Sequence, residues 1–163
     1  VSVLDIGTGS GAIAIVLKKE TDASVSAVDV SCEALEVAKK NADTLGAEIE
    51  FALSNLFENV KGKFDFVVSN PPYIESDVCL TLEPEVVDNE PILALDGGRD
   101  GLDFYREIIN RAPNFLNDGG KLYFEIGYNQ AEAVSNLMKE NFKNIKVYKD
   151  YGGNARVVAG EIV

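Results

Sequence analysis

The segment Asn70-Pro71-Pro72-Tyr73 is the part of the sequence with the clearest chemistry. It follows an apolar run, Phe64 to Ser69, that is typical of a buried strand. Each proline lacks a backbone N–H and fixes φ at about −65°, so the segment is rigid and displays carbonyl oxygens. The side-chain oxygen of Asn70 and the carbonyl of Pro71 could accept the two N–H groups of an amide or amino nitrogen. Tyr73 could pack on the same planar group.

A glycine loop lies about 65 residues earlier, where Gly7, Gly9 and Gly11 follow a first apolar strand. Glycine lets a chain turn sharply and lets a ligand approach the backbone closely. In the dinucleotide-binding pattern G-x-G-x-x-G the third glycine comes one residue later. The tighter loop, which includes Thr8, favours the amino-acid end of S-adenosylmethionine over a pyrophosphate. Asp5 supports this interpretation, because its carboxylate suits a cationic amino group; a plain strand–helix turn is the alternative.

A second strand is expected to end at Asp29, 18 residues after Gly11. A carboxylate at this position can accept hydrogen bonds from both hydroxyls of a ribose, as it does in dinucleotide folds. We therefore predict that Asp29 and the adjoining Val30 bind the cofactor. The alternative is that Asp29 caps the helix that begins after Ser31.

A nitrogen held by Asn70 and Pro71 and a cofactor held by the glycine loop together predict alkylation of that nitrogen. The lone pair of an amide nitrogen is delocalised into the carbonyl, so the reaction requires that the lone pair be aligned with the methyl donor. Holding reacting atoms about 3–3.5 Å apart in the right orientation contributes up to ~7–11 kcal/mol. A sulfonium leaves without help from a general acid. The absence of histidine from this chain is therefore no obstacle to the reaction.

Strand-like and helix-like patterns alternate along the chain. Strands are predicted at 1–6, 24–30, 48–53, 64–69, 121–126, 145–148 and 155–163, and helices at 12–20, 32–45, 102–116 and 130–141. This alternation predicts a parallel sheet with helices on both faces, whose ligands bind at the carboxyl ends of the strands. The stretch from Ile74 to Asp100 has no clean period, and we expect it to be a substrate-facing loop.

The composition limits the possible partners. The chain has 163 residues, one domain's worth, and a net charge of −12, which argues against a broad phosphate-binding surface. It has two cysteines and no histidine, so no metal site is expected, and Cys32 and Cys79 are interpreted as reduced thiols of a cytoplasmic protein. No apolar window approaches the ~18 residues of a membrane span. We expect a monomer that binds neither membranes nor nucleic acid.

Several further segments, together with the two motifs, resemble the catalytic domain of the release factor glutamine methyltransferases. The matching residues are Glu90-Pro91, Ala94-Leu95, Gly97-Gly98-Arg99-Asp100-Gly101-Leu102-Asp103, Tyr105-Arg106, Glu125-Ile126-Gly127, Gln130, Asn154-Ala155-Arg156-Val157-Val158 and Gly160. The resemblance covers the whole chain. It implies a class I S-adenosylmethionine-dependent methyltransferase fold, which is Rossmann-like, with a mostly parallel seven-stranded sheet and an antiparallel C-terminal strand.

The resemblance also implies a reaction, namely transfer of methyl from S-adenosylmethionine to the N5 amide of the glutamine in the Gly-Gly-Gln loop of peptide chain release factors. On that analogy Asn70 and the Pro71 carbonyl hold the glutamine, and Tyr73 packs beside it. Asn55 and Leu56 would meet the adenine, through a polar group at its exocyclic amine and an apolar one against the ring. An acid is commoner where Asn55 stands.

Family members also carry a helical N-terminal domain that helps dock the release factor. The chain begins inside a predicted strand, so we expect residues 1–163 to be the catalytic domain without that helical domain. Two other functions stay open: an adenine- or guanine-directed nucleic-acid amino methyltransferase, and a non-catalytic S-adenosylmethionine-binding module.

Three further assignments concern charged surface residues and the last acid of a predicted strand. Arg99 and Asp100 are expected to form a loop ion pair. The acidic residues Glu83, Glu85, Asp88 and Glu90 are expected on a solvated loop face. Glu125 is expected to have a structural hydrogen-bonding role.

Overall fold

The computed structural model describes residues 1–82 and 95–163. Its elements follow one another as β1 (Ser2–Ile6), α1 (Ala12–Glu20), β2 (Ser24–Asp29), α2 (Cys32–Leu45), β3 (Glu50–Leu53), β4 (Phe64–Ser69), α3 (Ser76–Cys79), α5 (Asp103–Arg111), the 3-10 helix η2 (Ala112–Phe115), β5 (Leu116–Glu125), α6 (Ala131–Met138), β6 (Phe142–Lys149) and β7 (Ala155–Ile162). The expected alternation of strands and helices is confirmed. The acidic residues assigned to a loop face, and the matching segment 90–94, lie outside the described residues.

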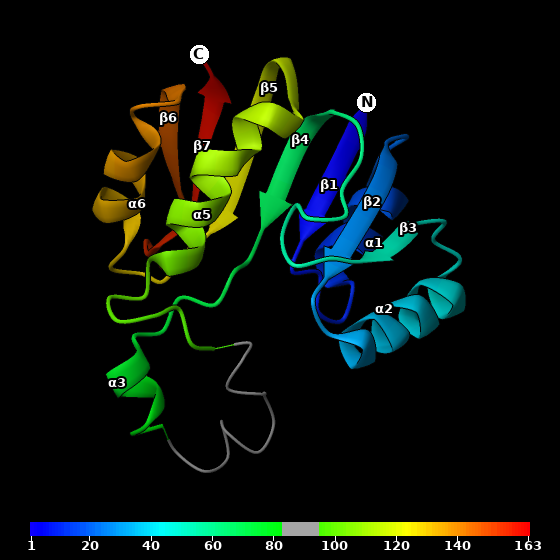
Figure 1. Ribbon diagram of the computed structural model, residues 1–163, viewed down its shortest axis with the longest axis horizontal. Helices are drawn as coiled ribbons and strands as arrows, with labels where there is room; N and C mark the ends of the chain where they lie inside the picture. The colour runs from blue at the N-terminus through cyan, green and yellow to red at the C-terminus, as the bar shows by residue number, and fades with distance from the viewer. Residues whose placement is uncertain (83–94) are drawn as a thin grey trace.

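The seven strands form a single sheet in the order β3-β2-β1-β4-β5-β7-β6 (Figure 1). The pairs from β3 to β5 are parallel, and β7 runs antiparallel to both of its neighbours, β5 and β6. This confirms the predicted seven-stranded, mostly parallel sheet with an antiparallel C-terminal strand. The chain leaves β1 toward β2 and later returns to place β4 on its other side. The point between β1 and β4 is therefore the topological switch point, where open α/β sheets bind ligands.

Alternate residues of the strands pack on the two faces of the sheet, as strand geometry requires. Leu4, Leu122 and Phe124 join the large core cluster that includes residues of α5 and α6. Val3 belongs to a smaller cluster with Ala14 of α1. In Figure 1, α5 lies in front of the sheet and α1 lies behind it. Helices therefore cover both faces of the sheet, as predicted.

The helix predicted over residues 102–116 is wrong at its C-terminal end. α5 ends at Arg111, a 3-10 turn containing Pro113 follows, and Leu116 already pairs with Phe64 as the first residue of β5. Proline cannot donate the i→i−4 hydrogen bond that would continue the helix. Two strands are also longer than predicted, since β5 begins at Leu116 and β6 covers Phe142–Lys149.

Between Phe64 and Phe66 of β4, the partner strand advances from Leu116 to Lys121. The intervening residues of β5 bulge out of the ladder, and Gly119 takes φ 73° there.

Within the two described ranges, no helix combines the length and apolar character that a membrane span requires.

Candidate active site

The pairing of β1 with β4 determines where the two sequence motifs meet. Ile6 is the register partner of Ser69, and the buried Ser69 hydroxyl donates a 2.8 Å hydrogen bond to the Ile6 carbonyl. Gly7 and Asn70, the next residues on each strand, therefore leave the sheet side by side. The structure brings the glycine loop and the Asn70–Tyr73 segment together at the switch point of the sheet.

The glycine loop adopts a conformation that other residues would resist. Gly7, Gly9 and Gly11 have φ values of 69°, 56° and 83°. A Cβ at Gly7 or Gly9 would meet no heavy atom within 4 Å, whereas one at Gly11 would lie 3.1 Å from the Ala38 Cβ of α2. The first two glycines thus leave room for a ligand against the loop backbone, and the third permits close packing of α1 on α2.

Asp5 lies beneath this loop and is 1% exposed. Its Oδ2 accepts a 2.7 Å hydrogen bond from the Thr8 hydroxyl, but no described residue donates to its Oδ1. Burial raises the pKa of Asp5 from 3.8 to about 6, although the Thr8 hydroxyl and the backbone N–H of Ala14 oppose the shift; the negative charge of Asp29 adds a smaller increase. Burying a carboxylate is costly unless a donor or a cation reaches it, and holding the ammonium of S-adenosylmethionine stays the role predicted for Asp5.

Asp29, at the end of β2, is half-buried and holds two backbone segments. Its Oδ2 accepts a 2.8 Å bond from the Gly9 N–H, and its Oδ1 accepts a 2.9 Å bond from the Ser31 N–H. The carboxylate therefore fixes the glycine loop and the start of α2, as the helix-capping alternative expected in part. A carboxylate has about four acceptor positions, so Asp29 can still accept from ribose hydroxyls. The neighbouring Val30 is 53% exposed and offers an apolar surface beside it.

The turn after β3 places its two predicted residues differently. Asn55 is exposed, and its Nδ2 donates a hydrogen bond to the Glu58 Oε1 at 3.1 Å. The Asn55 Oδ1 therefore points away from Glu58. Leu56 has φ 51° and is only 9% exposed, with its side chain in the large core cluster. Asn55 thus lies at the surface, while Leu56 lies mostly beneath it.

The Asn70–Tyr73 segment combines an exposed amide with buried neighbours. Asn70 is exposed, Pro71 is buried, and Pro72 and Tyr73 are half-buried. In the part of the chain that the structure describes, no hydrogen bond uses the Asn70 side chain or the Pro71 carbonyl. Within those residues, these two acceptors lie one residue apart and have no other partner; that they hold a substrate amide stays a prediction.

Three glycines let the rest of the chain approach this segment closely. A Cβ on Gly97 would lie 2.6 Å from the Pro72 carbonyl oxygen, and one on Gly101 would lie 2.4 Å from the Tyr73 carbonyl oxygen. A Cβ on Gly127 would lie 3.3 Å from the Tyr73 ring. Sequence reasoning matched these glycines to a family but gave them no role, because their contacts are with residues distant in the chain.

The base of the irregular loop is held by backbone contacts. The Ile74 N–H donates to the Leu95 carbonyl at 2.9 Å, and the Gly97 N–H donates back to the Ile74 carbonyl at 2.7 Å. The Ser76 hydroxyl donates to Asp96 at 2.7 Å, and this bond contributes most to lowering the pKa of Asp96. The loop predicted to face the substrate therefore leaves from the candidate active-site segment, Asn70–Tyr73, and returns beside it.

The ion pair predicted between Arg99 and Asp100 is wrong. The Asp100 carboxylate pairs with Arg106 of α5 and also accepts the Leu102 N–H at 3.1 Å. The hydrogen bond from Arg106 lowers the pKa of Asp100 to about 2. A carboxylate before a helix faces that helix's first turn, and an arginine on α5 is better placed to reach it than the preceding residue of the loop. The pair anchors the loop that carries Gly101.

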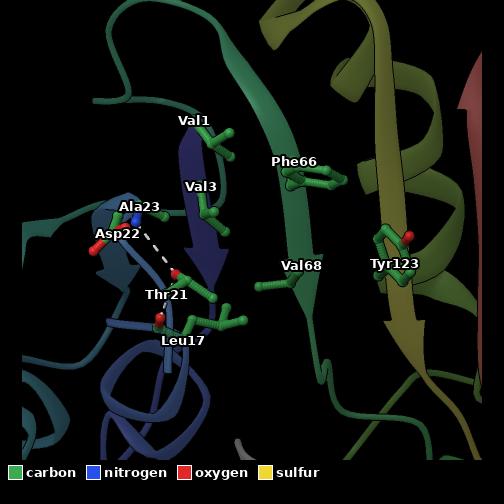
Figure 2. A pocket seen from close by; sticks show the side chains of 9 residues that line it. All are labelled: Val1, Val3, Leu17, Thr21, Asp22, Ala23, Phe66, Val68 and Tyr123. Carbon is green, nitrogen blue, oxygen red and sulfur yellow. Dashed lines mark hydrogen bonds between the residues drawn. The ribbon is translucent and has the colours of Figure 1, made fainter. Parts of the chain in front are cut away.

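An apolar cavity of about 440 Å³ lies elsewhere on the sheet. Its walls come from the start of β1 and the end of α1, with side chains of β4 and β5 completing it (Figure 2): Val1, Val3, Leu17, Thr21, Asp22, Ala23, Phe66, Val68 and Tyr123. The glycine loop follows the opposite end of β1. This cavity therefore does not contain the predicted site residues.

The comparisons with known proteins agree with this geometry. The family model described as Methyltransferase small domain matches residues 1–81. The release factor glutamine methyltransferase of Agrobacterium fabrum is 47% identical over 96% of this chain, and that of Lactococcus lactis is 42% identical over 96%. The chain is a methyltransferase domain that matches the catalytic portion of release factor glutamine methyltransferases. It spans 55% and 59% of the lengths of these two relatives.

Solved structures share the fold at lower identity. A methyltransferase from Pyrococcus furiosus matches with a TM-score of 0.76 at 20% sequence identity. The match covers 98% of this chain and 74% of the Pyrococcus chain. The 16S rRNA methyltransferase RsmC of Thermus thermophilus, solved with AdoMet and guanosine, has a TM-score of 0.68 at 20% identity over 99% of this chain and 37% of its own. The fold is that of class I methyltransferases, and S-adenosylmethionine is the cofactor that family and fold support.

The burial of Asp5 predicts how stability depends on pH. The folded state binds the Asp5 proton more tightly than the unfolded state, so this residue's contribution to stability is lost as pH rises from about 4 to above 6. A pKa raised from 3.8 to about 6 corresponds to a loss of roughly 3 kcal/mol. Asp5→Asn should therefore gain about that much relative to the unsubstituted protein between pH 4 and pH 7. Urea unfolding of both proteins without cofactor measures this; a difference that is constant with pH would contradict it.

Gly101→Ala tests the close approach to Tyr73. Gly119 is a matched control, because its φ of 73° is close to the 74° of Gly101 but a Cβ there would meet nothing within 4 Å. Gly119→Ala should lose about 1–2 kcal/mol for the left-handed backbone alone. Gly101→Ala should lose about 1–3 kcal/mol more, because the methyl group overlaps a carbonyl oxygen. Denaturant unfolding measures both; equal losses would show that the approach to Tyr73 carries no cost.

Proposed function

We propose that this chain transfers a methyl group from S-adenosylmethionine to the side-chain amide nitrogen of a glutamine in peptide chain release factors, in their Gly-Gly-Gln loop. The observation that carries the proposal is the adjacency of the glycine loop and Asn70–Tyr73 through the Ile6–Ser69 pairing. The names of relatives at 42–47% identity support the choice of substrate. The residues 1–163 are proposed to form one catalytic domain.

Each residue has a separate part in holding the cofactor. Asp5 would hold the ammonium group, and the open side of Gly7 and Gly9 would receive the amino-acid portion. Asp29 would bind the ribose, with Val30 and Asn55 beside the adenine. S-adenosylmethionine, when bound, supplies an electrophilic methyl group on a positively charged sulfur.

The amide would be held by the two acceptors of the active-site segment. The Asn70 Oδ1 accepts one N–H of the glutamine, and the Pro71 carbonyl accepts the other, which turns the nitrogen lone pair toward the methyl donor. Tyr73 packs on the planar amide and excludes water from one side. The nitrogen gains an N–C bond, the sulfur–methyl bond breaks, and the nitrogen gives up one proton to water. No histidine is required at any step.

The acidic character of the chain supports a protein substrate. A net charge of −12 disfavours the phosphate contacts that dominate nucleic-acid binding. A release factor is a component of the translation machinery, so the proposal includes a cytoplasmic location. We also propose that the chain acts as a monomer, which sedimentation would test.

Label transfer tests the substrate directly. Methyl-labelled S-adenosylmethionine is offered with a release factor, with the same factor carrying a replaced loop glutamine, and with adenine-containing DNA. We expect label in the unmodified factor alone. Label in DNA would favour the nucleic-acid class, and cofactor binding without transfer to any acceptor would favour a non-catalytic binding module.

Two substitutions separate the roles of substrate and cofactor residues. Asn70→Ala should lower transfer by about 100-fold or more, because a misaligned amide loses its orientation, while cofactor affinity stays within a few-fold. Asp29→Ala should weaken cofactor binding, since it removes the ribose acceptor and releases the Gly9 N–H. Calorimetry with S-adenosylmethionine measures both affinities. Loss of binding in Asn70→Ala, or unchanged affinity in Asp29→Ala, would refute the role assigned to that residue.

A further inference from the structure

Gln130, at the start of α6, makes a hydrogen-bonded connection to the active-site segment. Its Nε2 donates to the Tyr73 carbonyl at 2.9 Å and lies 3.4 Å from the Gly101 carbonyl. Its Oε1 accepts from the Gly127 N–H at 2.9 Å and lies 3.4 Å from the Tyr105 hydroxyl. One half-buried side-chain amide thus joins segments that are up to 57 residues apart in the sequence.

The surroundings allow only one orientation of this amide. The Gly127 N–H that faces Oε1 is a donor, and the two groups that face Nε2 are the carbonyl oxygens of Tyr73 and Gly101. Turning the amide over would set N–H against N–H and oxygen against oxygen. The space is also limited, because a Cβ on Gly127 would lie 3.0 Å from Oε1 and one on Gly101 would lie 3.1 Å from Nε2.

The contact matters because the active-site segment has few ways to be held. Pro71 and Pro72 have no N–H to donate, so the backbone from 70 to 73 is fixed mainly through its carbonyls and its packing. Of these carbonyls, that of Tyr73 accepts the hydrogen bond from the Gln130 Nε2. The peptide planes are rigid and the proline ring fixes φ of Pro72, so few soft torsions separate the Tyr73 carbonyl from that of Pro71.

We propose that Gln130 is a positioning residue for methyl transfer, whose Nε2 holds the Tyr73 carbonyl and through it the two acceptors, Asn70 and the Pro71 carbonyl. This inference rests on the proposed function. It does not make Gln130 a catalytic residue, because the side chain touches the segment that holds the substrate and neither the substrate nor the cofactor.

The two ends of the amide have separable roles. The Oε1 end closes a local turn, since the Gly127 N–H donates to it while the Gln130 N–H donates to the Gly127 carbonyl at 3.0 Å. The side chain does not cap its own helix. A purely structural role would depend mainly on this local turn, whereas positioning depends on the Nε2 donor. Gln130→Glu keeps the acceptor and removes the donor.

Tyr105→Phe is a matched control within the same cluster. The buried Tyr105 hydroxyl donates to the Glu125 carbonyl at 2.9 Å, so its removal costs stability. It leaves the Gln130–Tyr73 bond in place. The control therefore reports what a general loss of stability does to transfer.

The experiment measures kcat and KM for release factor methylation, and the dissociation constant of S-adenosylmethionine, for the unsubstituted protein and both variants. Gln130→Glu should lower kcat roughly 10- to 100-fold, the cost of a displaced reacting group, with cofactor affinity within two-fold. Tyr105→Phe should keep kcat within two-fold despite lower stability. A normal kcat in Gln130→Glu, or an equal fall in both variants, would overturn the inference.

Amide resonances give a reading that does not need transfer. In Gln130→Glu, the NMR resonances of the Asn70 side-chain amide and of the Ile74 backbone amide should shift. In Tyr105→Phe, the resonance of the Asn70 side-chain amide should stay unchanged. Unmoved resonances in Gln130→Glu overturn the positioning role even if the unsubstituted chain methylates nothing. Shifted resonances together with an inactive unsubstituted chain would support the role of Gln130 and refute the proposed function.

Discussion

The parallel pairing of β1 with β4 is the constraint on which the rest of the site depends. The register sets Ile6 opposite Ser69, and the Ser69 hydroxyl bonds to the Ile6 carbonyl. Because consecutive residues of paired strands leave the sheet at the same height, this one register fixes Gly7 beside Asn70. A shift by one residue would turn Leu4 and Ile6 out of the large core cluster and bring Asp5 to that face, so the pattern of β1 protects the geometry of the site.

On the cofactor side of the β1–β4 junction, the buried carboxylate of Asp5 is unfavourable for stability. Asp5 is buried with one oxygen unsatisfied, and its raised pKa records the cost of desolvating its charge. A protein that only needed a strand–helix turn would gain stability from an apolar residue at this position. Under the proposed function this carboxylate is the partner of a cationic ligand, which would restore the interaction that burial removed.

On the substrate side, the Asn70–Tyr73 segment depends on groups that its residues and their neighbours lack. Prolines remove backbone donors from the active-site segment, and glycines at 97, 101 and 127 remove the side chains that would hold neighbouring backbone away from it. The donor that this segment lacks is supplied by Gln130 from another element. The anchoring of Asp100 by Arg106 stabilises the loop that carries Gly101, so the ion pair supports the site from a distance.

The sequence by itself determined most of the element types, and it placed the glycine loop and the Asn70–Tyr73 segment directly after their strands. Local spacing carries that information: apolar periodicity marks strands and helices, and Gly7, Gly9, Gly11 and the Asn70–Tyr73 segment carry their meaning in their own backbone requirements. Pro113 was also a local signal, and the extension of the helix to Leu116 overlooked it.

Tertiary structure alone decided the remaining features. The pKa of Asp5, the pairing of Asp100 with Arg106, the burial of Leu56 and the grip of Gln130 on Tyr73 all depend on groups brought together from separate segments. Residue spacing along one segment does not specify which distant group fills the space beside it. Packing of the strands and helices makes that choice, because it sets burial, and burial sets which polar groups must find partners.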